Sequence, residues 1–81
     1  MQGSKRMTTQ PRKKQLFPGI VSDSEIDGGR PVIERTRVRV DIILGHLGAG
    51  MSIDEICYEY DLTENQVRTA IRYAVTLVPT K

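Results

Sequence analysis

The spacing of hydrophobic residues changes at Val40, and this change divides the chain into two parts. Before Val40 the hydrophobic residues occur in short pairs or in alternation, as where Val38 and Val40 alternate with Arg37 and Arg39. A period of two residues predicts short β-strands. We expect strands at about 20–21, 31–33 and 37–39, the last two as a hairpin or as separate strands.

From Val40 onward the hydrophobic residues recur every three or four positions, which predicts helices. Val40, Ile43, Leu44 and Leu47 share one face of the first expected helix. Gly50 is expected to close that helix, because glycine adopts the left-handed conformation of many helix ends.

Two further helix starts lie eleven residues apart, and each is marked by a capping box. In Ser52-x-x-Glu55 and Thr63-x-x-Gln66, the hydroxyl can accept a backbone N–H while the longer side chain reaches back. The hydrophobic faces that follow are Ile53, Ile56, Cys57 and Tyr60, and then Val67, Ala70, Ile71, Ala74 and Val78, with Pro79 marking the end. Two helices joined by about three residues, with a third to close them, are typical of a helix-turn-helix unit.

The length of 81 residues is enough for one small domain. Residues 1–15 are basic and almost devoid of hydrophobic side chains, which predicts a flexible arm. We expect a single domain over residues 16–81, with a β segment at 16–39 and a helical bundle at 40–79. The expected fold class is therefore mainly α: a three-helix helix-turn-helix bundle preceded by a short β-hairpin or strand segment and a flexible basic N-terminal arm.

Charge is distributed unevenly along the chain. Residues 1–39 contain nine Lys or Arg and four acidic residues, whereas residues 40–81 contain three basic and six acidic residues. The basic first half is compatible with a nucleic acid or an acidic protein as partner. No apolar run reaches the roughly 18 residues that span a membrane. The single cysteine, Cys57, excludes a disulfide within the chain, and we expect a cytoplasmic location.

The sequence contains no pattern that indicates an enzyme. There is no phosphate-binding loop, no Ser, His and Asp in a catalytic order and no metal-binding motif. Cys57 and His46 lie on different expected helices and do not suggest a metal site. We therefore expect no catalytic residue, no metal and no cofactor.

The outward face of the last expected helix carries polar side chains that suit DNA. Arginine can contact guanine or phosphate, and asparagine can contact adenine. The candidate DNA-binding residues are Thr63, Asn65, Gln66, Arg68, Thr69 and Arg72. The alternative is a protein-interaction module in which the helix-turn-helix is only structural. The acidic helix at residues 53–60 favours this alternative, because its carboxylates would repel phosphate.

A resemblance to a known family covers residues 27–74. The stretch DGGRPVIERTRVRVDIILGHLGAGMSIDEICYEYDLTENQVRTAIRYA resembles the bacterial family of domains of unknown function called DUF433. The shared signatures are Gly-Gly-x-Pro-Val-Ile, Thr-Arg-Val, Gly-Met-Ser and Glu-Ile. Arg35 departs from the family pattern, which has glycine before Thr36. Asp61 departs from the helix-turn-helix pattern, which favours glycine in the turn, although aspartate tolerates a positive φ better than most residues.

The resemblance implies a homeodomain-like helix-turn-helix and an antitoxin-like role of the VapB type. Such a protein would bind and block a toxin with a PIN-like fold, and the pair would repress its own promoter. We expect a homodimer, so that two helices meet successive major grooves of double-stranded DNA. The residues expected to contact the dimer partner or the toxin are Arg30, Val32, Ile33, Arg35, Arg37, Val38 and Arg39.

Overall fold

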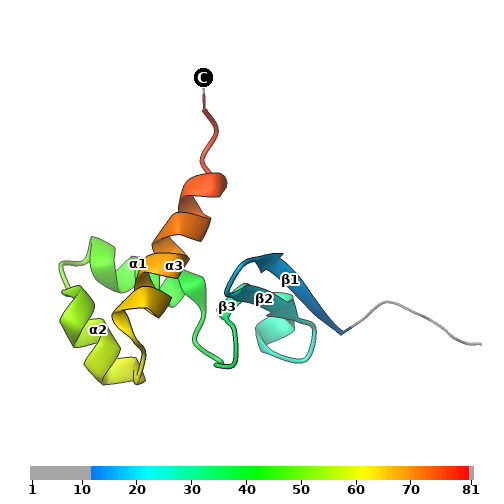
Figure 1. Ribbon diagram of the computed structural model, residues 1–81, viewed down its shortest axis with the longest axis horizontal. Helices are drawn as coiled ribbons and strands as arrows, with labels where there is room; N and C mark the ends of the chain where they lie inside the picture. Colours follow the sequence, from blue (N-terminus) through cyan, green and yellow to red (C-terminus); the bar gives the residue numbers. More distant parts are fainter. Residues whose placement is uncertain (1–11, 81) are drawn as a thin grey trace, which may run out of the picture.

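A computed structural model describes residues 12–80 of the chain. Their fold is a three-stranded antiparallel sheet followed by three α-helices. The elements are β1 (Lys13–Phe17), β2 (Ile20–Asp23), a short 3-10 helix η2 (Asp27–Gly29), β3 (Val32–Ile33), α1 (Val40–Gly48), α2 (Ile53–Tyr60) and α3 (Glu64–Thr76). The sheet lies toward one end of the molecule and α2 toward the other, with α1 and α3 between them (Figure 1).

The sheet is built around β2, which pairs with both other strands. A turn at Pro18 and Gly19 joins β1 to β2, and Gly19 has a φ of 90°. On the other side, Ile20 pairs with Ile33 and Val21 with Val32. Because side chains alternate along a strand, Ile20 and Ile33 face the helices while Val21 and Val32 face the opposite side.

Two expectations for the first half of the chain are wrong. Residues 37–39 form no strand, and only one isolated bridge joins Val32 to Arg39. The flexible arm was expected to extend to residue 15, but β1 already begins at Lys13, which pairs with Asp23 of β2. Backbone pairing with β2 orders Lys13–Gln15 although this stretch has no hydrophobic side chain. The remainder of the expected arm, residues 1–11, lies outside the described residues.

The helices begin where the sequence predicts. The Ser52 hydroxyl accepts the N–H of Glu55 at 3.1 Å, and the Glu55 carboxylate accepts the N–H of Ser52 at 2.8 Å. Thr63 and Gln66 form the same pair of hydrogen bonds at 3.1 and 2.8 Å. Each box provides acceptors for N–H groups that a helix start leaves unpaired. The positions of α2 and α3 along the chain are thus set locally.

The core joins the sheet to all three helices. Its buried members are Ile20, Ile33, Val40, Ile43, Ile56, Leu62, Val67, Ala70 and Tyr73. Full burial of each Val, Leu or Ile side chain among them contributes about 1.5–3 kcal/mol to the free energy of unfolding. Val78 was expected in this core but is 63% exposed, because α3 ends at Thr76. Within residues 12–80, no helix is both long and apolar enough to cross a membrane.

Candidate nucleic-acid interface

The turn between α2 and α3 places α3 across the other helices. Asp61 ends α2 in the left-handed conformation, with φ 56° and ψ 49°, and its N–H is bonded to the carbonyl of Cys57. Asp61 thus adopts the positive φ at the turn position where the helix-turn-helix pattern favours glycine. Leu62 is buried in the core at 7% exposure and anchors the turn. The start of α3 is consequently held both by hydrogen bonds and by packing.

Two of the candidate DNA-binding residues hold the first turn of α3. Thr63 is exposed and Gln66 is half-buried, and each bonds the other's backbone N–H. These side chains thus already have a structural function. Within the described residues, the Nε2 donors of Gln66 and the hydroxyl hydrogen of Thr63 form no hydrogen bond.

Arg68 lies on the exposed face of α3, where it is paired with an acid. Its Nε and Nη2 atoms donate to Glu64 Oε2 at 3.0 and 2.7 Å, and both side chains are 57% exposed. The i, i+4 spacing of the two residues in the sequence is a signal for this pair. An ion pair this exposed contributes little to stability, so Arg68 can exchange Glu64 for another acceptor.

Arg72 and Asn65 are neighbours on the same exposed face. Arg72 Nη2 donates to Thr69 Oγ1 at 3.1 Å and to Asn65 Oδ1 at 3.5 Å. No acidic side chain pairs with Arg72 among residues 12–80. Asn65, Arg68 and Arg72 therefore form one polar strip along α3, which we call the α3 strip.

Thr69 does not belong to this strip, which corrects the sequence-based expectation. It is 8% exposed, and its hydroxyl donates to the backbone carbonyl of Asn65 at 2.8 Å. A Cβ placed on Gly19 would lie 3.0 Å from Thr69 Cγ2, so the turn between β1 and β2 covers this side chain. Sequence periodicity could not reveal this, because the covering residue comes from the sheet.

Among the residues of the sheet region that were expected to contact a partner, some are buried and others are exposed. Val32 and Ile33 are 0% and 2% exposed, so their assignment as partner contacts is wrong. Val38 is half-buried against the core. Residues on both faces of β3 are covered here, whereas the alternation of residues suggests one open face. The backbone edge of β3 is likewise partly occupied by the bridge to Arg39.

Two of the arginines in that set are bound to Asp41. Arg39 Nε and Nη2 donate to Asp41 Oδ1 and Oδ2, both at 2.9 Å, and Arg30 Nη1 lies 3.8 Å from Oδ2. The hydrogen bonds from Arg39 lower the pKa of Asp41 below its ordinary value and raise the pKa of Arg39. In contrast, Arg35 and Arg37 are exposed and form no ion pair among residues 12–80.

The helix α2 adds negative charge at the other end of the molecule. Asp54, Glu55 and Glu59 are all exposed. The backbone N–H of Ser52 donates to the Glu55 carboxylate and is the larger cause of its lowered pKa, and the neighbouring Ser52 hydroxyl lowers that pKa further. No group of three or more His, Cys, Asp or Glu side chains is placed to bind a metal in the described part of the chain. His46 instead contacts Tyr60, with Nε2 and the phenol oxygen 2.7 Å apart.

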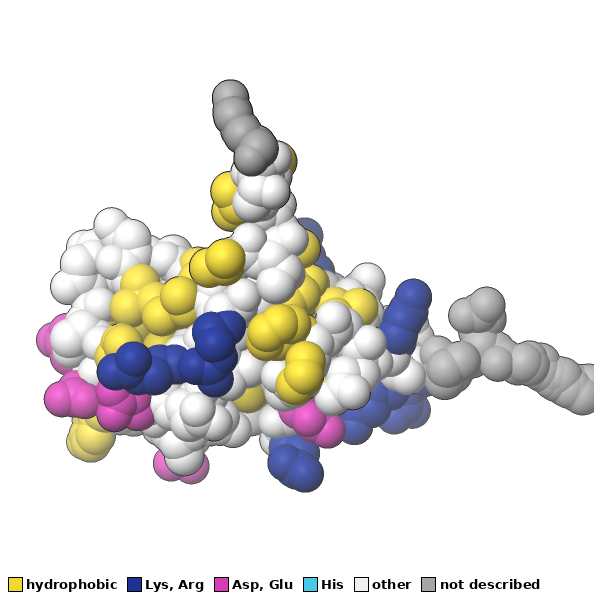
Figure 2. Space-filling model, turned by 45° about the horizontal axis from the view of Figure 1, so that its top comes forward, with side chains coloured by type: hydrophobic (Ala, Val, Ile, Leu, Met, Phe, Trp, Pro, Cys, Tyr) yellow, Lys and Arg dark blue, Asp and Glu magenta, His cyan; other side chains and the backbone are white. Residues whose placement is uncertain are grey.

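Hydrophobic side chains are exposed near the end of α3. Val75, Leu77 and Val78 are 64%, 62% and 63% exposed. Figure 2 shows hydrophobic surface on both sides of the basic side chains that lie over α3. Acidic side chains appear toward the α2 end of the same view.

Comparison with known proteins places the described fold in context. The family described as "Protein of unknown function (DUF433)" matches residues 20–74, from the start of β2 into the last turns of α3. No curated protein matches the chain. A similar solved structure is the X-ray crystal structure of Rv2018 from Mycobacterium tuberculosis, with 35% sequence identity and a TM-score of 0.59. The match covers 64% of this chain and 24% of Rv2018, so it spans about a quarter of that protein's length.

Proposed function

The chain belongs to the DUF433 family, and we propose that it is a DNA-binding regulator of the antitoxin type. In this proposal α2, the turn and α3 form a homeodomain-like helix-turn-helix, and α3 enters the major groove of double-stranded DNA. The protein also binds a toxin with a PIN-like fold, and the pair represses its own promoter. The toxin and the promoter come from the resemblance to the family.

The observation that carries DNA binding is the α3 strip on a firmly held helix. Asn65, Arg68 and Arg72 are exposed along one face of α3, while Val67, Ala70 and Tyr73 bury the other. Arginine and asparagine are the side chains that make bidentate contacts with guanine and adenine. Such contacts require a fixed helix, and the capping box and Leu62 supply that rigidity.

A homodimer would double this contact. Each copy presents one α3, and dimeric helix-turn-helix proteins place two such helices in major grooves about 34 Å apart. A pair of half-sites at that spacing would be the expected operator. The exposed hydrophobic residues at the end of α3 are suited to bury surface between copies.

Fluorescence anisotropy with labelled duplexes tests the proposal. One duplex comes from upstream of the gene, and the other is a scrambled sequence of the same length. Each is titrated with wild type, with Arg68→Lys/Arg72→Lys and with Arg68→Ala/Arg72→Ala. Lysine keeps the charge but lacks the planar fork of donors, so the Lys variant should lose sequence preference by roughly 10- to 100-fold. The Ala variant should also bind both duplexes more weakly.

The control is Arg30→Ala/Lys14→Ala, which removes the same charge outside the α3 strip. It should retain the preference for the upstream duplex. Equal binding of both duplexes by wild type would refute sequence-specific DNA binding. Retained preference in the Ala variant would refute the assignment to the α3 strip.

A second candidate function is protein interaction with no DNA contact. The pairing of Arg68 with Glu64 and the exposed Val75, Leu77 and Val78 favour it. In that case wild type binds neither duplex specifically, and adding the product of the neighbouring gene does not change this. Direct binding of that product, measured by calorimetry, would then be lost in Leu77→Asp.

A further inference from the structure

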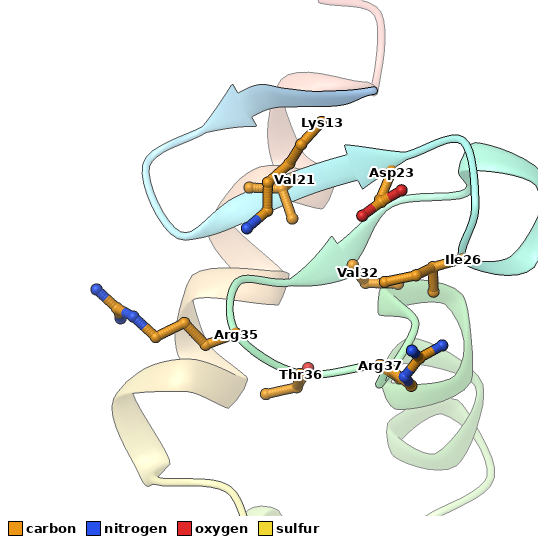
Figure 3. A pocket seen from close by; sticks show the side chains of 8 residues that line it. All are labelled: Lys13, Val21, Asp23, Ile26, Val32, Arg35, Thr36 and Arg37. Carbon is orange, nitrogen blue, oxygen red and sulfur yellow. The ribbon is translucent and has the colours of Figure 1, made fainter. Parts of the chain in front are cut away.

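A cavity of about 480 Å³ opens on the face of the sheet that is turned away from the helices. Val21 and Val32 lie in its wall, and both are at most 5% exposed. Lys13 of β1 and two residues of the loop after β3, Arg35 and Arg37, line it as well (Figure 3). The cavity therefore has buried apolar side chains in its wall and three basic side chains around it.

These basic side chains differ from most others in the molecule. Arg12, Arg30, Arg39 and Arg68 each form an ion pair with a carboxylate. Lys13, Arg35 and Arg37 form none with residues 12–80. We call these three residues the sheet cluster. The sequence pattern did not place Lys13 in a sheet, because residues 13–15 lack the hydrophobic alternation of a strand.

The charge of the one carboxylate in the cavity wall is balanced by an arginine. Asp23 is 4% exposed, lies 3.1 Å from Arg12 Nε and accepts the N–H of Glu25 at 2.9 Å. The cavity thus carries excess positive charge. In Figure 3 the Arg35 and Arg37 side chains extend toward opposite sides, and Lys13 approaches from the strand above. Spread charges of this kind suit an extended polyanion better than a single small anion.

The loop that carries the two arginines is held in shape. The N–H and the hydroxyl of Thr36 both donate to the carbonyl of Ile33, at 3.0 and 2.7 Å, and the hydroxyl accepts the N–H of Val38 at 3.0 Å. Arg35 has a φ of 66°, at a turn position where glycine is favoured. Within the described residues, the N–H groups of Arg35 and Arg37 have no acceptor. The loop therefore presents fixed donors and charges to solvent.

The loop is also tied to α3. The N–H of Glu34 donates to the carbonyl of Gly19 at 2.9 Å, and Gly19 packs against Thr69. A smaller hollow of about 110 Å³ is lined by Arg35 together with Asn65 and Gln66. Arg35 thus stands between the sheet cavity and the start of α3. The sheet cluster and the α3 strip lie on neighbouring surfaces.

We infer that the sheet cluster binds the sugar–phosphate backbone of double-stranded DNA beside the groove that α3 enters. Phosphate contacts position a protein on DNA but carry no sequence information, and they make affinity depend on salt. The cluster would supply affinity, and the α3 strip would supply sequence preference. This inference rests on the proposed DNA binding.

The test is a salt series of anisotropy titrations with the same upstream and scrambled duplexes. The variant is Arg35→Gly/Arg37→Gln, in which glycine keeps the turn conformation at residue 35. Its matched control is Arg30→Gln/Lys14→Gln, which removes equal charge outside the cavity. Thermal unfolding by circular dichroism verifies that both variants are folded.

We expect the Arg35→Gly/Arg37→Gln variant to bind both duplexes more weakly by a similar factor, roughly 10-fold near 0.1 M salt. The slope of log affinity against log salt should fall by about 1.8, or about 0.9 for each lost phosphate contact. The control should change neither quantity by as much, and the preference for the upstream duplex should remain.

The other outcomes separate this inference from the proposed function. Sequence preference with an unchanged salt slope in the variant would overturn the sheet cluster and leave the α3 strip intact. Salt-dependent binding without preference, weakened by the variant, would support the cluster and overturn sequence-specific regulation. Equal losses in variant and control would mean that only net charge matters, and absence of binding to either duplex would overturn both.

Discussion

The contact between the sheet and the helices depends on a single residue, Gly19. Its φ of 90° is unfavourable for other residues, and a Cβ there would lie 3.0 Å from Thr69 Cγ2. Its carbonyl also accepts the N–H of Glu34. One residue therefore holds the turn between β1 and β2, the arginine-bearing loop and α3 in contact.

We predict that Gly19→Ala destabilises the protein by more than about 1 kcal/mol, because strain and crowding add. The matched control is Gly45→Ala in α1, where a Cβ meets nothing within 4 Å. That change should stabilise the protein by up to about 1 kcal/mol, since alanine favours helix. Urea unfolding followed by circular dichroism measures both. Equal stability of Gly19→Ala and wild type would show that the sheet and α3 are not tightly coupled.

The helices depend on each other because they are short. α1 and α2 have nine and eight residues, fewer than the roughly 12–15 that make an isolated helix even marginal in water. Their stability must come from packing and from their ends. The two capping boxes and the buried Leu62 between them supply this for α2 and α3.

Removing either cap should destabilise the whole domain. We predict a loss of about 1 kcal/mol for Ser52→Ala and a similar loss for Thr63→Ala. Thr80→Ala, an exposed position beyond α3, is the control and should change stability little. The midpoint of urea unfolding gives the comparison. A loss confined to Ser52→Ala would mean that packing alone holds the start of α3.

On the scale of the whole molecule, charge is separated between the two ends. The sheet end carries basic side chains that form no ion pair within residues 12–80, and α2 with its exposed acids lies at the other end (Figure 1). In the proposed complex with DNA, this separation would turn the sheet end toward the polyanion and keep the acidic helix away from it. The α3 strip lies between these ends. Its Arg68 pairs with Glu64 one turn earlier in the same helix, whereas the sheet cluster forms no ion pair among residues 12–80.

Acid should weaken the folded state through Asp41 and Glu55. Both have a lowered pKa in the folded protein, so the unfolded chain binds more protons as the pH falls. Their contribution is complete above the unfolded pKa, about 4, and is lost as the pH drops through the lower folded values. Asp41→Asn/Glu55→Gln should therefore lose less stability than wild type between about pH 5 and about pH 2. Urea unfolding at each pH measures this, and parallel losses would contradict the assignment.

Local patterns in the sequence determined the helices and where they begin. A capping box needs residues only three positions apart, and Asp61 could be judged on its own tolerance of a positive φ. The hydrophobic period placed Val40, Ile56 and Val67 correctly in the core. These features were predictable because every group involved lies within one or two turns of its partner.

Tertiary structure alone decided which polar residues stay exposed. Thr69 is covered by a turn fifty residues earlier in the chain, and the pairing of β1 with β2 orders residues that have no hydrophobic pattern. Both faces of β3 are covered, so the side chains of Val32 and Ile33 are buried and cannot contact a partner. Arg35 and Arg37 are exposed and still can. Sequence determined the helices because their hydrogen bonds are local. Burial depends on neighbours that only the folded chain brings together.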